Sequence, residues 1–502
     1  MDSREYFFGI LSKEEQEKIT SLVTITELLK NGLEKYSDNI AIAGSHGQTT
    51  YKELYEDVGK VRGYLEGLNL KTGSHVGILF VNNYDFVKFF LGITTMGFVA
   101  VAFPMTMDGL TLGSSLTKMD VNVLFHGEQT LPLIDSIKNN MTQISFINTN
   151  KLSLDKFIEA PEIDKELPAA IMFTGGTTGI PKGALLSHKA LMQGAFNGIF
   201  ATGSAFEQRY YALIPFTHIF GLVRSFLTAL YTGSQVYLCE NMKNIFNDFP
   251  KAKPTIMALV PALANMIYGI IISKGIEAIG GNLKVIICGG ANVTPDLIKR
   301  FYAIGIDVLP GYGLTETANL VSGNGYSIEY PESVGMPYFC QELKLVNGEL
   351  WVKGDNVMIE YYNDKEETAK VMEDGWFKTG DLVRIDEDGL LYIVGRTKNV
   401  IILENGENVS PEEIESLLYD VPVVMDCLVY EDKNQFGDGI IAVEILPNMK
   451  VFEDAEIIDV SFTFEKVIAD INAMLPSFKQ IKKTVIRQDD FKRSPSMKII
   501  RK

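Results

Sequence analysis

A stretch rich in glycine and threonine carries the residue types that bind a polyphosphate. It runs from Ile171 to Ala184 and contains four glycines, three threonines and one lysine. Glycine lets backbone N–H groups approach phosphate oxygens, threonine hydroxyls donate further hydrogen bonds, and Lys182 supplies a mobile positive charge. The Walker pattern closes on Gly-Lys-Ser/Thr, whereas here Pro181 precedes the lysine and Gly183 follows it. The sequence therefore predicts nucleotide binding, but not an ordinary P-loop ATPase or GTPase.

Length, charge and cysteine content limit the classes of function. A chain of 502 residues with 46% hydrophobic residues can bury large cores, and its length suits about two to four domains. The formal net charge of −17 disfavours binding to nucleic acid or to anionic membrane surfaces. The four cysteines form no CxxC pair, so we expect neither a zinc site nor a disulfide framework, and a cytoplasmic location. The mixed charge of the first residues gives no sign of a secretory signal.

One uncharged stretch, from Pro254 to Ser273, is long enough to consider as a membrane span. Pro261 divides it, and Asn265 makes its second half more polar. A buried strand over Thr255–Val260 followed by a helix that begins at Pro261 explains the same residues better. The sequence therefore predicts no integral membrane segment.

Strand and helix patterns alternate along most of the chain. Apolar spacing and apolar runs predict helices over Tyr51–Gly67, Phe86–Met96 and Thr294–Ile304, and strands over His75–Val81, Val99–Phe103, Ala169–Phe173, Lys284–Cys288 and Ile306–Leu309. Such alternation is typical of an α/β domain. The fragment Leu133–Ile137, between two predicted strands, is interpreted as a loop.

The pattern changes near Ser333. Short strands separated by glycine and acidic turns are predicted over Glu342–Val346, Gly348–Val352 and Leu390–Val394, which indicates a small β-rich subdomain. A compact unit of mixed strand and helix follows. Its basic tail, in an acidic protein, indicates either a surface that meets an anion or a solvated terminus.

Six further segments, taken together with the loop, resemble a known family. They are Pro215–Gly221, Gly289–Ala291, Gly311–Thr317, Trp376–Asp381, Gly395–Lys398 running on to Asn405–Pro411, and Ser494–Lys498. In this order and spacing the chain resembles the adenylate-forming (AMP-binding) superfamily, in its acyl-CoA synthetase or acid–thiol ligase branch. The resemblance covers residues 25–502 or nearly so.

The resemblance implies an α/β fold with two domains. The large N-terminal AMP-binding domain would span residues 1–397, with two packed sheets in an α/β part to about residue 332 and a small β-barrel-like subdomain over about 333–397. The small, mobile α+β C-terminal domain would span residues 398–502, with a hinge at Lys398.

The resemblance also implies an ATP-dependent carboxylate–CoA ligase that acts on a fatty or other organic acid. It would work through an acyl-adenylate, release pyrophosphate and AMP, and use Mg²⁺, with CoA as the acceptor substrate. One alternative is a stand-alone enzyme that loads the phosphopantetheine of an acyl carrier protein. Another is a degenerate adenylate-binding protein, which the retention of Lys182, Glu316, Asp381, Arg396 and Lys498 disfavours.

The resemblance assigns the nucleotide site as follows. The β- and γ-phosphates would be held by Thr174, Gly175, Gly176, Thr177, Thr178, Gly179 and Lys182. The purine would lie against Gly289, Gly290, Ala291, Tyr312 and Gly313, with the tyrosine ring stacked on it. A flexible turn would explain the glycines of the loop alone, and a tyrosine is more often a packed core aromatic.

Four further residues would serve the ribose, the metal ion and the α-phosphate. Asp381 suits the two ribose hydroxyls, because a carboxylate accepts two donors, and Arg396 would reinforce it. A surface salt bridge between these two residues is the alternative. Glu316 would bind Mg²⁺, because a hard cation with phosphate ligands needs only one or two protein carboxylates. Thr315 would donate to the α-phosphate.

Lys498 would be the catalytic lysine, which reaches the region between the acid and the α-phosphate. Met497 stands where the family usually has glycine, so the backbone there has less freedom. Rotation about Lys398 would exchange this lysine for a loop that lines the thiol channel, since one site must serve two half-reactions. The residues of that loop would be Gly406, Glu407 and Asn408.

The acid would bind beyond a gate residue, His218, although a lone histidine is more often a packed core residue. The residues predicted to line this substrate pocket are Ile219, Phe220, Arg224 and Ala318. No aspartate lies between Phe216 and Phe226, which argues against an amino-acid substrate. Arg224 could bind the second carboxylate of a dicarboxylic acid, but an ion pair outside the pocket is the more common use of such a residue. The sequence does not define the chain length of the acid.

Overall fold

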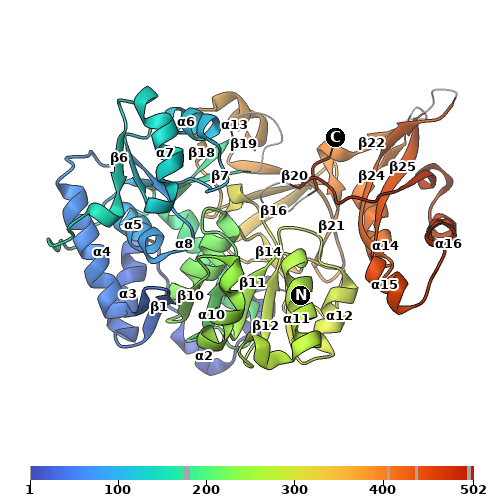
Figure 1. Cartoon of the computed structure of the whole chain (residues 1–502), viewed down its shortest axis with the longest axis horizontal. Coiled ribbons are helices and arrows are strands. Elements are labelled where there is room, and N and C mark those ends of the chain that lie inside the picture. Colours follow the sequence, from blue (N-terminus) through green and yellow to red (C-terminus); the bar gives the residue numbers. More distant parts are fainter. Residues whose placement is uncertain (1, 175–180, 404–406, 436–438, 494–498, 502) are drawn as a thin grey trace.

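Two large sheets form the body of the molecule, and a smaller unit lies beside them at the C-terminal end of the chain (Figure 1). The computed structural model describes residues 2–174, 181–403, 407–435, 439–493 and 499–501. The first sheet is nine-stranded and the second is seven-stranded. Both are mainly parallel, with antiparallel strands at their edges. This arrangement confirms the predicted α/β fold.

The strands of the nine-stranded sheet lie in the order β15 (Met336–Pro337), β14 (Ser322–Gly323), β13 (Asp307–Tyr312), β12 (Val285–Cys288), β11 (Ile256–Leu259), β9 (Arg209–Ala212), β10 (Gln235–Leu238), β1 (Ile40–Gly44) and β2 (Gly47–Thr50). The order in the seven-stranded sheet is β18 (Glu360–Tyr361), β8 (Gly183–Ser187), β7 (Pro168–Phe173), β4 (Val99–Ala102), β3 (His75–Leu79), β5 (Val123–His126) and β6 (Ser145–Asn148). Most parallel strands are buried on both faces, as their continuous apolar runs predict.

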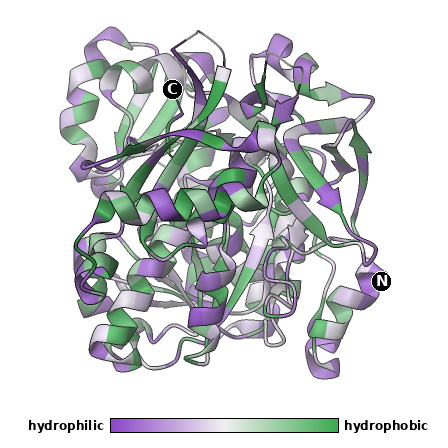
Figure 2. Cartoon of the chain, turned by 90° about the vertical axis from the view of Figure 1, so that its right-hand side faces the viewer, coloured by the Kyte–Doolittle hydropathy of each residue, from purple (hydrophilic) through white to green (hydrophobic). Residues whose placement is uncertain are grey.

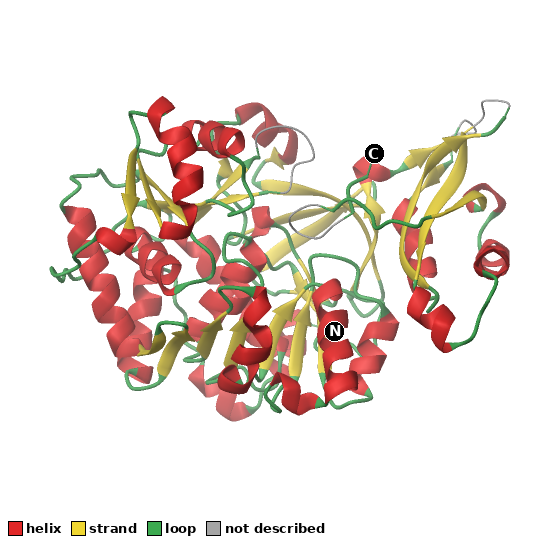
Figure 3. Ribbon diagram, viewed as in Figure 1, coloured by secondary structure: helices red, strands yellow, loops and turns green. Residues whose placement is uncertain are grey.

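Helices fill the space between the two sheets and cover their outer faces (Figure 3). The helices whose apolar residues contribute to the core shared by the two sheets are α3 (Ile25–Tyr36), α4 (Tyr51–Glu66), α5 (Tyr84–Thr94), α8 (His188–Asn197) and α9 (Thr228–Tyr231). The outer face of the nine-stranded sheet packs on α10 (Ile245–Ala252), α11 (Pro261–Lys274) and α12 (Pro295–Tyr302). The seven-stranded sheet packs on α6 (Gly109–Lys118) and α7 (Leu131–Ile137).

Local sequence explains where several of these elements begin. Helix α4 starts at a capping box in which Thr50 and Glu53 satisfy each other's backbone N–H groups, and its apolar face is fully buried. Helix α11 starts at Pro261 after β11, as predicted, and no helix in the described ranges is long and apolar enough to cross a bilayer. The interpretation of Leu133–Ile137 as a loop is wrong. These residues belong to α7, whose first turn contains Pro132, a residue preorganised for that position.

An antiparallel five-stranded sheet follows and confirms the β-rich subdomain. Its strands are β16 (Gln341–Val346), β17 (Glu349–Gly354), β20 (Trp376–Ile385), β19 (Met372–Glu373) and β21 (Leu391–Arg396), the last paired with β20. The short helix α13 (Lys365–Val371) precedes β19. At the other end of the chain, α1 (Ser3–Ile10) and α2 (Lys13–Lys18) precede α3.

The C-terminal unit is a separate α+β body with its own core. Its elements are β22 (Ile401–Ile402), β23 (Asn408–Val409), α14 (Pro411–Tyr419), β24 (Val424–Lys433), β25 (Gly439–Pro447), α15 (Met449–Asp454), α16 (Val460–Met474) and β26 (Ile481–Ile486). Figure 2 faces this unit and shows helices that carry both polar and apolar residues. That composition fits helices with one face against a sheet and one in water.

A buried histidine at the start of α8 predicts how stability depends on pH. The side chain of His188 is fully buried, its Nδ1 accepts a hydrogen bond from the N–H of Ile25 at 3.4 Å, and its Nε2 has no partner. Burial lowers the pKa of His188 from 6.5 to about 4. At pH values well above 6.5 the ring is neutral in both states. As the pH falls toward 4, His188 becomes protonated in the unfolded chain but stays neutral in the folded chain. Protonation therefore stabilises the unfolded state, and the free energy of unfolding falls.

We therefore expect the free energy of unfolding to drop by an amount on the order of 3 kcal/mol between about pH 7 and about pH 4 through this residue alone. Urea unfolding across that range, in the wild type and in His188→Gln, measures the contribution, and the variant should show a shallower slope. The exposed His46 provides the control, since His46→Gln should change the slope less. Equal slopes in the wild type and His188→Gln would contradict the prediction.

Candidate active site

The predicted site residues come from the carboxyl ends of β12 and β13, from the β20–β21 hairpin, and from the segment around β8 and β18. Parallel strands end at one edge of a sheet, so the turns after β12 and β13 lie next to each other there. The backbone N–H of Met358, shortly before β18, donates to the carbonyl of Glu316 at 2.8 Å and ties the third group to the turn after β13.

The end of β12 presents bare backbone. Gly289 is buried, and a Cβ added there would lie 2.9 Å from the carbonyl oxygen of Gly311 on β13. Gly290 has φ +77°, a left-handed conformation that suits glycine, and both Gly290 and Ala291 are exposed. A flat edge of this kind is what the predicted purine slot requires. Binding of a purine there stays a prediction.

Tyr312, Asp381 and Arg396 form one hydrogen-bonded cluster. The tyrosine hydroxyl donates to Oδ2 of Asp381 at 2.6 Å, and Nε of Arg396 donates to Oδ1 at 2.5 Å. The register of β20 and β21 places Asp381 opposite Arg396. Burial, then the neighbouring carboxylate of Asp381, raises the pKa of Tyr312 well above its usual value, so the phenol stays protonated and donates.

This cluster differs from the expected alternative. Asp381 is only 3% exposed, so its ion pair with Arg396 is not a surface salt bridge. A carboxylate has about four acceptor positions, and the two protein donors leave positions for ribose hydroxyls. Tyr312 is half-buried and packs against the small core formed by Val321, Leu350, Val352, Val383 and Leu391.

The turn after β13 has a strained backbone. A Cβ added to Gly313 would lie 1.4 Å from the carbonyl oxygen of Asn319, so only glycine fits at this position. Ala318 and Asn319 follow with φ of 46° and 84°, two consecutive left-handed residues that are not glycine. Strain of this kind is concentrated at functional sites. The 3₁₀ turn Thr315–Thr317 lies between Gly313 and these two left-handed residues, and it carries the predicted α-phosphate and metal residues.

Glu316 and Lys182 are linked through Tyr361, a residue that sequence reasoning missed. The hydroxyl of Tyr361 donates to Oε1 of Glu316 at 2.5 Å, and Nζ of Lys182 lies 5.1 Å from the centre of the same ring. Lys182 also forms an ion pair with Glu367 on α13, a second residue that was missed. Hydrogen bonds from Lys182 and Lys370 lower the pKa of Glu367 from 4.5 to about 2.

No local signal identified these two partners, because their contacts join residues far apart in the chain. The Tyr361–Glu316 contact spans 45 residues and the Lys182–Glu367 contact spans 185. Glu367 places carboxylate oxygens on the lysine, and these oxygens stand in for the phosphate oxygens that Lys182 is predicted to bind.

Glu367→Gln is expected to lower the KM for ATP by about two- to fivefold, because the nucleotide no longer competes with a carboxylate for Lys182. Initial rates of pyrophosphate exchange against ATP concentration measure this change. Glu366→Gln, a change at the exposed neighbouring position on the same helix, is the matched control and should leave the KM unchanged. A higher KM in Glu367→Gln would show that the carboxylate positions the lysine rather than competing for it.

Several predicted residues lie outside the described part of the chain: Gly175, Gly176, Thr177, Thr178, Gly179, Gly406 and Lys498. At the first of these segments, the N–H of Thr174 donates to the carbonyl of Lys182 at 2.9 Å, so the two flanks of the loop are held together. At the last, Arg493 pairs with Ile499 as an isolated bridge.

The residues present fit a Mg²⁺ ion held mainly by phosphate. Among the described residues, no group of three or more histidine, cysteine, aspartate or glutamate side chains could hold a metal ion by itself. Glu316 is a buried carboxylate with one oxygen engaged by Tyr361. A single carboxylate of this kind suits Mg²⁺, which completes its octahedron with phosphate oxygens and water.

Most of the predicted acid-pocket residues follow β9, whereas Ala318 lies in the turn after β13. His218 is half-buried, and its Nδ1 accepts a hydrogen bond from the N–H of Phe220 at 3.2 Å, so it is not the fully packed histidine of the alternative. Ile219, Phe220 and Ala318 are buried. A π-helical turn, Gly221–Leu227, follows directly, and such turns are frequent at functional sites.

Arg224 in this π-helical turn contradicts the expected ion pair outside the pocket. Its side chain is 2% exposed, and Nη1 donates to the carbonyl of Gly198 at 2.7 Å. No acidic side chain of the described ranges pairs with it, and its Nε has no partner. The side chain of Arg224 lines a small cavity and does not take part in a surface ion pair.

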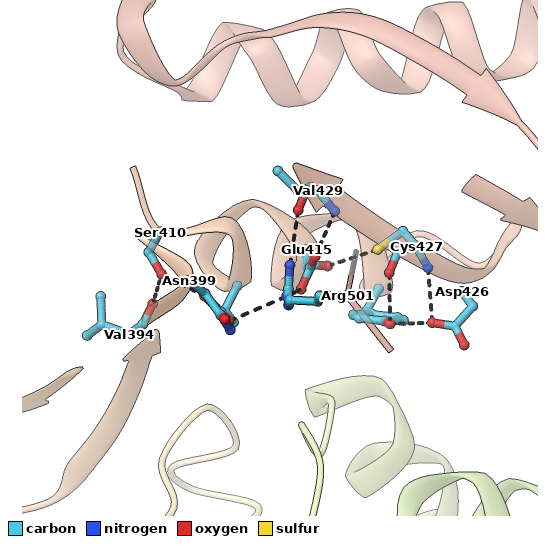
Figure 4. A network of polar contacts seen from close by, with 10 residues as sticks. Val394, Asn399, Ser410, Glu415, Asp426, Cys427, Val429 and Arg501 are labelled. Atoms are coloured by element: carbon cyan, nitrogen blue, oxygen red, sulfur yellow. Dashed lines mark hydrogen bonds and ion pairs between the residues drawn. The ribbon is translucent and has the colours of Figure 1, made fainter. Parts of the chain in front are cut away.

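The junction at Lys398 is exposed, and two hydrogen bonds attach the start of α14 to the segments on either side of it (Figure 4). The hydroxyl of Ser410 donates to the carbonyl of Val394 at 2.7 Å, and Nδ2 of Asn399 donates to Oε1 of Glu412 at 2.5 Å. These bonds connect β21 and the junction with the start of α14.

The same network holds the end of the chain. Arg501 donates to Oε2 of Glu415 on α14 at 2.6 Å and to the carbonyl of Val429 on β24 at 3.0 Å (Figure 4). Glu407 and Asn408 of the predicted thiol-channel loop are exposed on this unit, where the carbonyl of Glu407 accepts from the N–H of Leu403 at 3.0 Å. Their place in a thiol channel stays a prediction.

Comparison with known proteins agrees with this geometry. Feruloyl-CoA synthase of an Amycolatopsis species is 29% identical over 412 residues, which cover 78% of this chain and 82% of that protein. Long-chain-fatty-acid–CoA ligase FadD13 of Mycobacterium tuberculosis is 25% identical over 478 residues, which cover 90% and 92%. A solved structure of the anthranilate CoA ligase AuaEII in complex with anthranoyl-AMP shares the fold, with a TM-score of 0.86 and 21% identity over 96% of both chains.

Family models extend these matches to both units of the chain. Residues 398–502 match the AMP-binding enzyme C-terminal domain, and residues 29–362 match the AMP-binding enzyme. The larger match covers more than half of the sequence and contains the loop, the turn after β13 and the acid pocket. The chain therefore belongs to the AMP-binding enzyme family.

Proposed function

We propose that this enzyme is an ATP-dependent carboxylate–CoA ligase. The observation that carries the proposal is the convergence of three groups from separate parts of the fold. These are the buried Asp381 with its two donors, the buried Glu316 on a strained turn, and Lys182 beside Tyr361. They suit a ribose, a metal ion with its phosphate, and a polyphosphate. The relatives named above are CoA ligases or synthases, which supports the same activity.

In the first half-reaction, a carboxylate oxygen of the acid attacks the α-phosphorus of ATP. A new P–O bond forms, the bond to the bridging oxygen breaks, and pyrophosphate leaves with the electron pair. Lys182 and the threonine-rich loop neutralise the departing phosphates, while Thr315 and Lys498 donate to oxygens at the reacting phosphorus. Bound Mg²⁺ would supply further charge neutralisation between phosphate oxygens, with Glu316 as its protein ligand.

The hydrogen-bonded cluster of Tyr312, Asp381 and Arg396 orients the nucleotide. Asp381 holds the hydroxyls, and Tyr312 and Arg396 fix the carboxylate from both sides, so the α-phosphorus has one position relative to the acid. Attack in line on a fixed phosphorus converts a bimolecular encounter into an effectively unimolecular step.

In the second half-reaction, the thiolate of CoA attacks the acyl carbonyl and AMP leaves with its phosphate oxygen. Our proposal includes a rotation of the C-terminal unit about Lys398, which removes Lys498 and brings in the loop of Gly406, Glu407 and Asn408. The contact across the junction supports this part of the proposal, because a single neutral hydrogen bond, from Ser410 to Val394, resists rotation only weakly.

One experiment tests the proposal and its rivals. We expect pyrophosphate exchange with at least one acid of a panel of short, long, aromatic and dicarboxylic acids, and thioester formation with free CoA. Thioester formed only with a purified phosphopantetheine carrier would establish the carrier-loading enzyme instead. Absence of exchange with every acid would favour a degenerate adenylate-binding protein. A reducing cytoplasm is part of the proposal, and the four free cysteine thiols suit it.

A further inference from the structure

Arg224 is a buried cation whose charge the described protein does not balance. It projects from the π-helical turn Gly221–Leu227, is 2% exposed, and makes one hydrogen bond, to the carbonyl of Gly198. A guanidinium taken out of water is destabilising unless an anion or a full set of acceptors replaces the water. The unpartnered Nε shows that the set is incomplete.

A second buried arginine shows the contrast. Arg62 is also fully buried with one nitrogen unpartnered, but its Nε donates to the carbonyl of Ile158 and its Nη1 to Oγ1 of Thr95. Its guanidinium also lies 5.5 Å from the ring centre of Tyr55. Arg62 is therefore a structural arginine with more acceptors, whereas Arg224 has a free donor next to empty space.

That empty space is a cavity of about 10 Å³, close to the volume of one water molecule. Apart from Arg224, its lining is Ile287, Leu309, Pro310, Gly311, Leu320, Gly323, Asn324 and Tyr338. The amide nitrogen of Asn324 already donates to two backbone carbonyls, those of Tyr330 and Ser333. Arg224 is the single charged group among the lining residues, and one oxygen atom of a carboxylate in this space would accept a hydrogen bond from its guanidinium.

The cavity adjoins the proposed adenylate site without being part of it. Gly311 directly precedes Tyr312 on β13, and a Cβ on Gly289 would lie 3.9 Å from the ring of Phe220, so the acid pocket and the purine edge share a wall. Thr315 and Glu316 do not line the cavity. A group held at Arg224 is thus separate from the carboxylate that reacts.

We propose that Arg224 binds a second carboxylate of the acid, and that the preferred substrates of this enzyme are dicarboxylic acids. The inference rests on the proposed function and specifies its substrate class. One carboxylate of the acid reacts with ATP, while the other accepts hydrogen bonds from the guanidinium at the end of the pocket. The buried charge pair that forms favours this acid over a monocarboxylate of equal length, because the monocarboxylate leaves Arg224 unpaired.

The test compares, within each enzyme variant, kcat/KM for a dicarboxylic acid with kcat/KM for a monocarboxylic acid. Pyrophosphate exchange gives kcat/KM for unbranched dicarboxylic acids of increasing length and for monocarboxylic acids with the same number of carbons. We expect the wild type to prefer the dicarboxylic acid at its best length, and Arg224→Met to lower that preference by about 100-fold while retaining exchange with the monocarboxylic acid. Arg224→Lys, which keeps the charge, should lower it less. Partial unfolding of a variant lowers both rates by the same factor, so it leaves the ratio unchanged.

Arg62→Met is the matched control, since it removes a buried arginine from another part of the core and should leave the preference unchanged. A wild type that uses monocarboxylic acids at least as well at every length would overturn the inference and keep the proposed function. So would an Arg224→Met variant with an unchanged ratio. Absence of exchange with all the acids would overturn the proposed function and this inference with it.

Discussion

Replacing Lys498 with alanine is expected to lower the rate of adenylate formation by about 10²–10³-fold and to leave thioester formation from preformed acyl-adenylate within about threefold of the wild type. The lysine is proposed to donate to the oxygens between the acid and the α-phosphorus, where charge develops only in the first half-reaction. Pyrophosphate exchange measures that half, and release of AMP from synthetic acyl-adenylate in the presence of CoA measures the other.

Lys492→Ala is the matched control for this prediction. Lys492 lies in the same basic tail and is exposed, so its removal changes the local charge equally without touching the proposed reaction centre. It should alter neither half-reaction. Equal losses in both half-reactions of Lys498→Ala would refute the exchange of the C-terminal unit between two poses.

Gly313→Ala is expected to lower adenylate formation by about 100-fold or more, because the added methyl group would lie 1.4 Å from the carbonyl oxygen of Asn319. Neither atom can move alone. The backbone of the turn must shift, and the turn carries Thr315 and Glu316. The shift should also lower the free energy of unfolding by about 2–4 kcal/mol. Pyrophosphate exchange and urea unfolding measure the two effects.

The control for this substitution is another glycine-to-alanine change in the same domain. Gly269 lies exposed in α11, and nothing would approach an added Cβ within 4 Å. Gly269→Ala should raise stability by about 0.5–1 kcal/mol, because alanine loses less entropy than glycine in a helix, and leave activity unchanged. Near-normal exchange in Gly313→Ala would show that the turn tolerates movement and that its strain has no functional role.

The elements that local sequence determines were predictable. The spacing of Leu54, Val58, Val61 and Leu65 predicts α4, and its capping residues define the first turn. The apolar run of β12 with two glycines after it predicts a strand that ends at a bare edge. In each case the interactions that determine the element join residues close together in the sequence, so the local pattern of residues is enough to predict it.

Long-range contacts were the part that could not be predicted. The sequence shows Lys182 but not that Glu367 pairs with it, because any acidic residue of the chain is a possible partner until the fold selects one. Arg224 was expected in an ion pair outside the pocket, and that expectation is wrong. Its burial depends on the packing of a π-helical turn against strands far away in the chain, which no periodicity records.

One hydrogen bond that crosses Lys398 bears on the proposed domain rotation. The bond from the hydroxyl of Ser410 to the carbonyl of Val394 on β21 must break when the C-terminal unit rotates, whereas the bond from Asn399 to Glu412 lies within that unit and rotates with it. A neutral hydrogen bond contributes about 1 kcal/mol, so on the order of 15% of molecules have this bond open at any moment. The junction therefore biases the enzyme toward one pose without locking it there, and substrate binding needs to supply only a small free energy to change the pose.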